Sequence, residues 1–170
     1  MSLLFRLMIS RFEKKAADSA EEKERVSLTA NAKVMKLAGV VIAAFFAVMQ
    51  ALMLYAAVAQ TSVEMVKVLC VLIGSLLIVL GNFMPKTRKN AVVGLRIKWS
   101  MYNDTTWMKS NRFGAVVMVI AGILMAATGL LAKPACAGVL VIIWVLAAVL
   151  IQSVYSYKVY REELKKEKSK

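Results

Sequence analysis

The sequence predicts an all-α, polytopic membrane protein in which four transmembrane helices form a bundle with both termini in the cytoplasm. One observation is the hydrophobic fraction of 60%, above the roughly half that is usual in soluble domains. Another is that apolar residues gather in four runs without a charged residue, at 37–63, 68–85, 113–132 and 134–157. Each run approaches or exceeds the roughly 20 residues that a helix needs to cross a bilayer.

The distribution of Lys and Arg predicts the orientation of these spans. Eight precede the first run, seven lie between the second and third, and six follow the fourth, whereas the two other connections hold one each. Because cytoplasmic loops are rich in basic residues, the N-terminus, the middle loop and the C-terminus are expected inside the cell. The same residues would meet anionic lipid headgroups. This placement argues against nucleic acid as the partner of the basic surplus.

Two cytoplasmic segments are expected to flank the membrane domain. Residues 1–36 precede it, and within them residues 3–12 have the periodicity of a short amphipathic helix. Such a helix would lie in the membrane interface or pack on the cytoplasmic end of the bundle, and the pattern does not decide between these. Residues 158–170 form a charged tail that has little to bury.

The membrane domain covers residues 37–157, with spans at about 37–60, 66–85, 112–132 and 135–157. Small residues recur at close to heptad spacing in the second and third spans, and such stripes let helix backbones approach closely. They predict that these two spans meet at the centre of the bundle. The glycines concerned are Gly74, Gly81, Gly114, Gly122 and Gly129.

The cytoplasmic loop at 86–111 has a composition unlike the rest of the chain. Asn90 and Gly94 tolerate a positive φ, so a folded turn is expected there. Arg96 and two tryptophans place cationic and aromatic groups at the membrane surface. Ser100 is expected to cap a helix that runs through Trp107 into the third span. The loop could be an interfacial anchor or a structured docking surface.

Catalysis is not expected. The chain has no histidine, and Asp104 is the only carboxylate of the loop. No nucleophile stands beside a recognisable base, and no cluster offers three metal ligands. The sequence therefore predicts neither an enzyme nor a cofactor. Cys70 and Cys136 are expected to serve as small apolar residues, with a disulfide between them left open.

The loop and the end of the second span resemble the SdpI family of bacterial membrane proteins over about residues 72–132. The family pattern is close to GN-aromatic-MPK, then N, G-[IL]-R, W-[ST], W and HR. The matching residues are Asn82, Pro85, Lys86, Asn90, Gly94, Arg96, Trp99, Trp107, Asn111 and Arg112. Asn111 departs from the pattern, because histidine is common at that position.

The resemblance implies a non-enzymatic protein of the bacterial cytoplasmic membrane that gives immunity to, or signals the presence of, a secreted membrane-active peptide toxin. It also implies a cytoplasmic repressor that docks on the loop. Two other classes stay open: a small transporter or channel component, and a structural subunit of a larger membrane complex. Self-association of so small a bundle is open as well.

Overall fold

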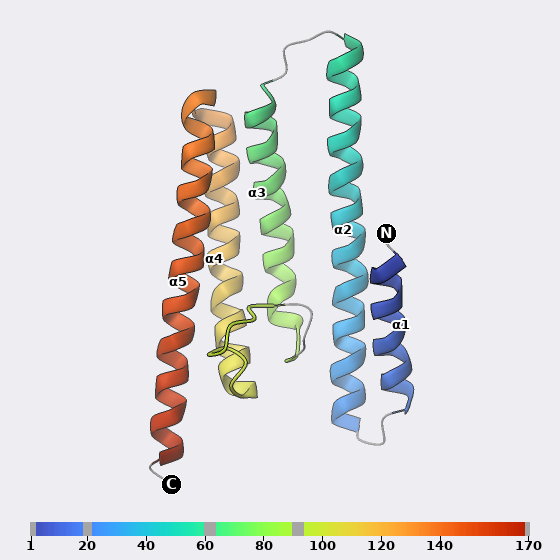
Figure 1. The fold of residues 1–170 in the computed structure, drawn as a ribbon, viewed down its shortest axis with the longest axis vertical. Coiled ribbons are helices and arrows are strands. Elements are labelled where there is room, and N and C mark those ends of the chain that lie inside the picture. Colours follow the sequence, from blue (N-terminus) through green and yellow to red (C-terminus); the bar gives the residue numbers. More distant parts are fainter. Residues whose placement is uncertain (1–2, 19–21, 60–63, 90–93, 169–170) are drawn as a thin grey trace.

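The computed structural model describes residues 3–18, 22–59, 64–89 and 94–168, and this part contains helices and turns but no strand. The predicted all-α class is confirmed. Figure 1 shows the long helices running side by side along the longest axis, with the first, shorter helix beside the lower half of the second. The elements are α1 (Leu3–Asp18), α2 (Glu22–Ala59), α3 (Met65–Phe83), the 3-10 helix η1 (Met84–Lys86), α4 (Asp104–Leu131) and α5 (Pro134–Lys168).

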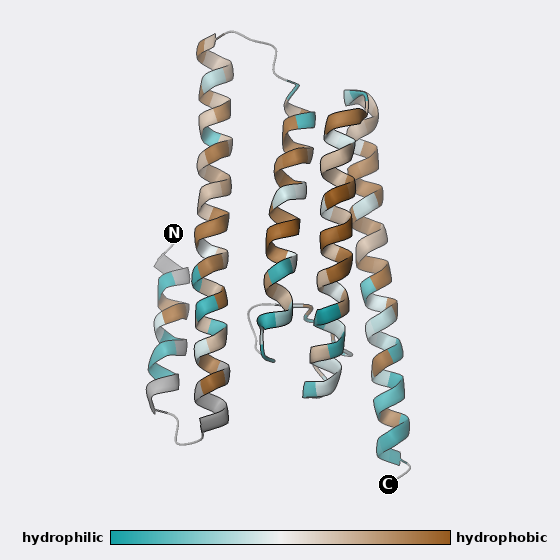
Figure 2. Cartoon of the chain, turned by 180° about the vertical axis from the view of Figure 1, so that it is seen from behind, coloured by the Kyte–Doolittle hydropathy of each residue, from teal (hydrophilic) through white to brown (hydrophobic). Residues whose placement is uncertain are grey.

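Four of these helices are long and apolar enough to cross a membrane, so the chain is a multi-pass membrane protein. Their middles are predominantly hydrophobic, whereas the last turns of α5 are hydrophilic (Figure 2). The 35 residues of α5 make a helix of about 52 Å, longer than a hydrocarbon core of about 30 Å requires. The end of α5, from Lys158 onward, therefore extends beyond the apolar run of residues 134–157.

The contact between α3 and α4 rests on glycines that let the two backbones touch. A Cβ atom on Gly74 would lie 2.5 Å from the carbonyl oxygen of Gly122, and one on Gly122 would lie 2.6 Å from that of Gly74. Towards the far end, a Cβ atom on Gly129 would lie 2.7 Å from the carbonyl oxygen of Lys67. The predicted glycine contact between the second and third spans is therefore confirmed at Gly74, Gly122 and Gly129, and also at Gly81, where a Cβ atom would lie 3.1 Å from the Ala115 carbonyl oxygen. The prediction is wrong for Gly114, where a Cβ atom would lie 3.2 Å from the side-chain oxygen of Gln152 in α5.

Polar and aromatic side chains join α4 to α5. The Ser110 hydroxyl donates to the Ser156 hydroxyl at 3.0 Å, and both residues are buried. Nearer the other end, the indole N–H of Trp144 donates to the Thr128 hydroxyl at 3.2 Å. Each pair satisfies polar groups between the helices, where lipid cannot.

The helix α2 stands apart from α3, α4 and α5 over most of its length. Phe46 and Val58, for example, are 64% and 84% exposed. The helix meets the rest of the protein near its beginning, where the side-chain oxygen of Asn31 accepts a hydrogen bond of 3.0 Å from the backbone N–H of Arg88. The second and third helices of the chain thus form a much looser hairpin than α4 and α5 do (Figure 1).

The N-terminal helix α1 packs along the first half of α2, antiparallel to it (Figure 1). An ion pair between Glu13 and Lys36 joins the two helices, and Ile9 is buried between them. The amphipathic segment thus packs on α2, and its placement relative to the membrane interface stays a prediction. The helix also runs to Asp18, beyond the predicted end at residue 12.

The two cysteines do not form a disulfide. Cys70 is buried within α3, and Cys136 is exposed in the first turn of α5. Their different accessibilities agree with the expectation that they act as separate small side chains.

Replacing Gly122 by Ala should destabilise the protein, because the new Cβ atom would meet the Gly74 carbonyl oxygen at 2.6 Å and force the helices apart. Overpacking of this kind costs about 1–3 kcal/mol. Gly138→Ala is the matched control, since nothing lies within 4 Å of a Cβ atom there. Thermal unfolding in detergent should give a lower Tm for Gly122→Ala and an unchanged or higher one for Gly138→Ala. Equal Tm values would contradict a close α3–α4 contact.

Candidate functional site

The motif begins where α3 ends and η1 turns the chain. Pro85 has no N–H to give to the carbonyl of Gly81, and the backbone N–H of Met84 takes this place. The Asn82 amide instead donates to the carbonyl oxygen of Ile78 at 2.9 Å. The Asn82 side chain thus bonds within its own helix and does not satisfy the carbonyl that Pro85 leaves free. The turn is closed by Thr87, whose hydroxyl donates to the Met84 carbonyl at 2.8 Å.

A buried amide at position 111 holds the start of the following loop. The side-chain oxygen of Asn111 accepts a hydrogen bond of 2.8 Å from the backbone N–H of Leu95. Its side-chain nitrogen donates to the carbonyl oxygen of Trp107 at 3.0 Å. Because both ends of the amide are bonded, the loop backbone is fixed to the first turns of α4.

Gly94 allows the loop to come this close. Its φ of +116° is a conformation that other residues rarely adopt. A Cβ atom there would lie 2.5 Å from the side-chain oxygen of Asn111 and 2.9 Å from the indole of Trp107. The glycine is therefore required twice, by backbone conformation and by space. The predicted folded turn is present at Gly94, whereas Asn90 lies outside the described residues.

Trp107 is part of the loop's core and does not lie at its surface. Its exposed fraction is 2%, and its indole N–H points to the carbonyl oxygen of Thr87 at 3.4 Å. The sequence alone favoured an interfacial anchor for this side chain. In the structure, the indole of Trp107 lies between the end of η1 on one side and Gly94 on the other.

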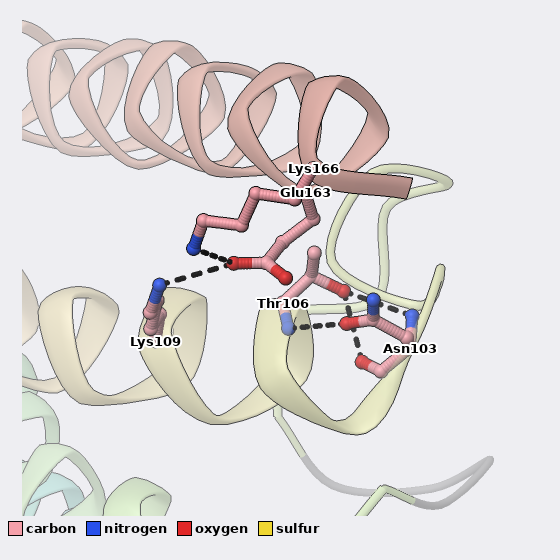
Figure 3. Close-up of polar contacts among 5 residues, drawn as sticks. All are labelled: Asn103, Thr106, Lys109, Glu163 and Lys166. Carbon is pink, nitrogen blue, oxygen red and sulfur yellow. Dashed lines mark hydrogen bonds and ion pairs between the residues drawn. The ribbon is translucent and has the colours of Figure 1, made fainter. Parts of the chain in front are cut away.

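The cap of α4 is Asn103, and the prediction of Ser100 was wrong. The side-chain oxygen of Asn103 accepts from the backbone N–H of Thr106 at 2.7 Å, and the Thr106 hydroxyl accepts from the backbone N–H of Asn103 at 2.9 Å (Figure 3). This reciprocal pair is a capping box. The Ser100 hydroxyl is instead buried inside the loop, where it accepts from the Ile97 N–H at 3.3 Å.

The extension of α5 supports the loop from the outside. Glu163 accepts from Lys109 of α4 at 3.2 Å and from Lys166 at 3.0 Å (Figure 3). Hydrogen bonds from Lys166 and Lys109 lower the pKa of the Glu163 carboxyl. The Tyr102 hydroxyl donates to Glu167, and that hydrogen bond raises the pKa of the tyrosine.

The loop and the part of α5 that Trp99 contacts carry an exposed group of cationic and aromatic side chains. We call it the outer loop face and define it by Arg96, Lys98, Trp99, Tyr157 and Arg161. The rings of Trp99 and Tyr157 meet edge to face with centroids 5.0 Å apart, and the Arg161 guanidinium lies 5.9 Å from the Tyr157 ring centroid. Arg96 and Lys98 are exposed. Arg96 makes no hydrogen bond or ion pair with the described residues.

A cavity of about 870 Å³ lies on the opposite side, between the beginning of α2, η1 and the first turns of α4. Four predicted site residues line it: Pro85, Lys86, Trp107 and Arg112. The residues of the motif thus lie in three separate places. Gly94, Trp107 and Asn111 meet in the loop's core, Arg96 and Trp99 belong to the outer loop face, and Asn82 and Pro85 shape the end of α3.

Sequence reasoning missed the residues that hold this arrangement from a distance. Asn31 of α2 binds the backbone at Arg88, and Glu163 of α5 binds Lys109. The sequence offered one local signal, the N-x-x-T spacing of the capping box at Asn103. The other contacts join segments far apart in the chain. Among the residues that the structure describes, no group of three His, Cys, Asp or Glu side chains could hold a metal.

Comparison with known proteins gives a family for the region that contains the loop. Residues 86–156 match the model of the SdpI/YfhL protein family, so the predicted resemblance is confirmed, over a segment that extends further towards the C-terminus. The chain is 30% identical over 90 residues to "Immunity protein SdpI" of Bacillus subtilis (strain 168), which covers 53% of this chain and 43% of that one.

A second relative is "Uncharacterized protein YfhL" of the same organism, 34% identical over 61 residues, or 34% of this chain and 56% of that one. The matches thus span about half the length of each curated relative. No solved structure matches the chain.

Asn111→Ala should loosen the loop, because the Leu95 N–H loses its acceptor and the Trp107 carbonyl its donor. An unsatisfied group of this kind costs about 1–3 kcal/mol, so trypsin cleavage after Arg96 should be roughly tenfold faster when it follows local opening. Asn82→Ala is the control, since Asn82 is exposed and bonds only within its own helix. Equal cleavage rates for the two variants would contradict the role of Asn111.

Proposed function

We propose, from the premise that residues 86–156 belong to the SdpI/YfhL family, that this membrane protein confers immunity to, or signals, a secreted membrane-active peptide. The observation that carries the proposal is the folded motif from η1 to the start of α4, which lies within or beside the matched segment. A relative that matches 53% of this chain is named as an immunity protein. The proposed function needs no cofactor and no enzymatic step.

The proposed orientation places the motif loop and both termini in the cytoplasm of a bacterial cell. Its support is the concentration of basic residues in the N-terminal segment, the middle loop and the tail. The described part of the motif loop, the end of α1, the beginning of α2 and the end of α5 also lie at one end of the molecule (Figure 1). Lys133 and Pro134 lie at the other end, which would face the secreted peptide.

The outer loop face is the proposed docking surface for a cytoplasmic partner such as a repressor. Its cations are Arg96, Lys98 and Arg161, and its aromatic rings are Trp99 and Tyr157. Planar guanidinium groups bind carboxylates with two hydrogen bonds, and aromatic residues are common at protein interfaces. An acidic segment with apolar side chains would fit this chemistry.

The transporter alternative has less support. A transport path needs intramembrane polar side chains that face one another or a water-filled space. Ser75 donates to the Val71 carbonyl, and Thr128 donates to the Leu124 carbonyl, each within its own helix. These hydroxyls are thus satisfied without a solute.

The orientation is tested with the exposed thiol of Cys136, in a Cys70→Ser background. A membrane-impermeant maleimide added to intact cells should label Cys136 fully, because it lies beside the proposed outer turn. A variant that also carries Cys136→Ser and Lys98→Cys should be labelled only after the cells are opened. Labelling of Lys98→Cys from outside would contradict the orientation.

The immunity proposal is tested by survival of a toxin-sensitive bacterium against a panel of secreted membrane-active peptides. At matched membrane levels, the wild type should protect and Arg96→Ala should lose most of the protection. Lys165→Ala is the control, because Lys165 is an exposed cation of the α5 extension outside the outer loop face. Equal protection by all three chains would remove Arg96 from the working surface, and no protection by the wild type would count against immunity.

A further inference from the structure

More basic than acidic side chains line the cavity beside η1. Its lining includes four cations, Lys86, Arg88, Lys89 and Arg112, against one carboxylate, Asp104. Within the described part of the chain, Lys86, Lys89 and Arg112 form no ion pair. Lys86 lies 5.3 Å from the ring centroid of Phe83, and Lys89 reaches the Tyr102 carbonyl at 3.5 Å. A concave surface lined by one sign of charge concentrates the field and attracts counter-ions.

Hydrogen bonds to neighbouring groups hold the segments that line the cavity. The Arg88 N–H is bonded to Asn31 of α2, the Thr87 hydroxyl to Met84, and the Trp107 indole points to the Thr87 carbonyl. The cations on η1 and α4 are therefore presented from a fixed backbone. A site of this kind loses little conformational freedom when a ligand enters.

Apolar residues in the remaining lining decide the class of ligand. Val26, Pro85 and Met108 contribute to the same cavity, so a fully hydrated inorganic ion would leave part of it unmatched. The cavity also lies where the apolar runs of α3 and α4 end, at Phe83 and Phe113. This is the level at which the phosphate groups of the bilayer lie in the proposed orientation.

We propose that this cavity is a binding site for the phosphate headgroup of an anionic phospholipid, with Lys86 and Arg112 as its principal phosphate contacts and Val26 and Met108 beside the glycerol and first acyl carbons. The assignment concerns the face of the motif opposite to the outer loop face. It does not rest on the proposed immunity function. It does connect with the loop, because Trp107 lines the cavity and packs under Gly94.

The test uses the purified full chain in nanodiscs of phosphatidylcholine that contain phosphatidylglycerol as a minor component. Native mass spectrometry counts the phosphatidylglycerol that stays on the protein after the nanodisc is removed. The wild type should retain one phosphatidylglycerol in preference to phosphatidylcholine. Each Lys or Arg near anionic lipid contributes about fivefold in affinity, so Lys86→Gln/Arg112→Gln should bind on the order of 20-fold more weakly.

Two control variants distinguish binding in the cavity from diffuse charge attraction and from a folding defect. Lys165→Gln/Lys168→Gln removes the same charge from the α5 extension, outside the cavity, and should retain the lipid. Lys86→Arg/Arg112→Lys keeps the charge of the cavity and should also retain it, which separates loss of charge from a folding defect. An equal loss in the extension variant, or equal retention of phosphatidylcholine, would overturn the proposal in favour of diffuse attraction or unspecific apolar contact.

The source of the phosphate is distinguished by a second measurement. Inorganic phosphate is added to the protein in nanodiscs of phosphatidylcholine alone, and Tm is recorded. No rise in Tm, together with retained phosphatidylglycerol in the first experiment, supports a lipid site. A rise in Tm with no retained phosphatidylglycerol would overturn the lipid proposal in favour of a soluble anion. If an acidic peptide displaced the lipid and inorganic phosphate did not, the proposal would be overturned in favour of a protein partner.

Discussion

The close approach of α3 and α4 is the constraint on which the rest of the structure depends. Lipid chains are as apolar as leucine, so helices in a bilayer gain little from hydrophobic burial and associate through close packing. Gly74 and Gly122 bring the two backbones into contact at mid-length, and Gly129 extends this contact towards the far end. The separation of the ends of α3 and α4 is thereby fixed. The intervening loop must fold within that space, which is why its turn conformations are so restricted.

The neutral side-chain amide of Asn111 holds the loop within this space. Asn111 accepts from Leu95 and donates to Trp107 with one planar group. A neutral imidazole, the group common at this position in the family that the motif resembles, also offers one donor and one acceptor. The local fold thus needs hydrogen-bonding capacity at position 111 and not a charge. The departure from the family pattern leaves the architecture of the loop intact, and a role that requires titration at this position would be lost.

The sequence predicted those features that depend on local pattern. The four apolar helices, the glycine contact and the continuous helix through Trp107 all follow from periodicity, length and spacing. The cap of α4 was misassigned because Ser100 and Asn103 are both good capping residues, and the burial of Ser100 within the loop decides between them. The burial of Trp107, the support from Glu163 and the cavity beside η1 depend on segments far apart in the chain. No local sequence pattern predicts that α2 and the end of α5 contact the loop.

The two faces of the motif share one wall, and this has a mechanical consequence. Trp107 lines the cavity, and its indole lies 2.9 Å from the point where a Gly94 side chain would begin. An occupant that presses on the indole has no free space to push it into, because interiors are close-packed. Gly94, Leu95 and Arg96 follow one another in the loop that packs on this indole. The position of one rigid side chain thus shapes both faces, and the α3–α4 contact holds the helix that carries it.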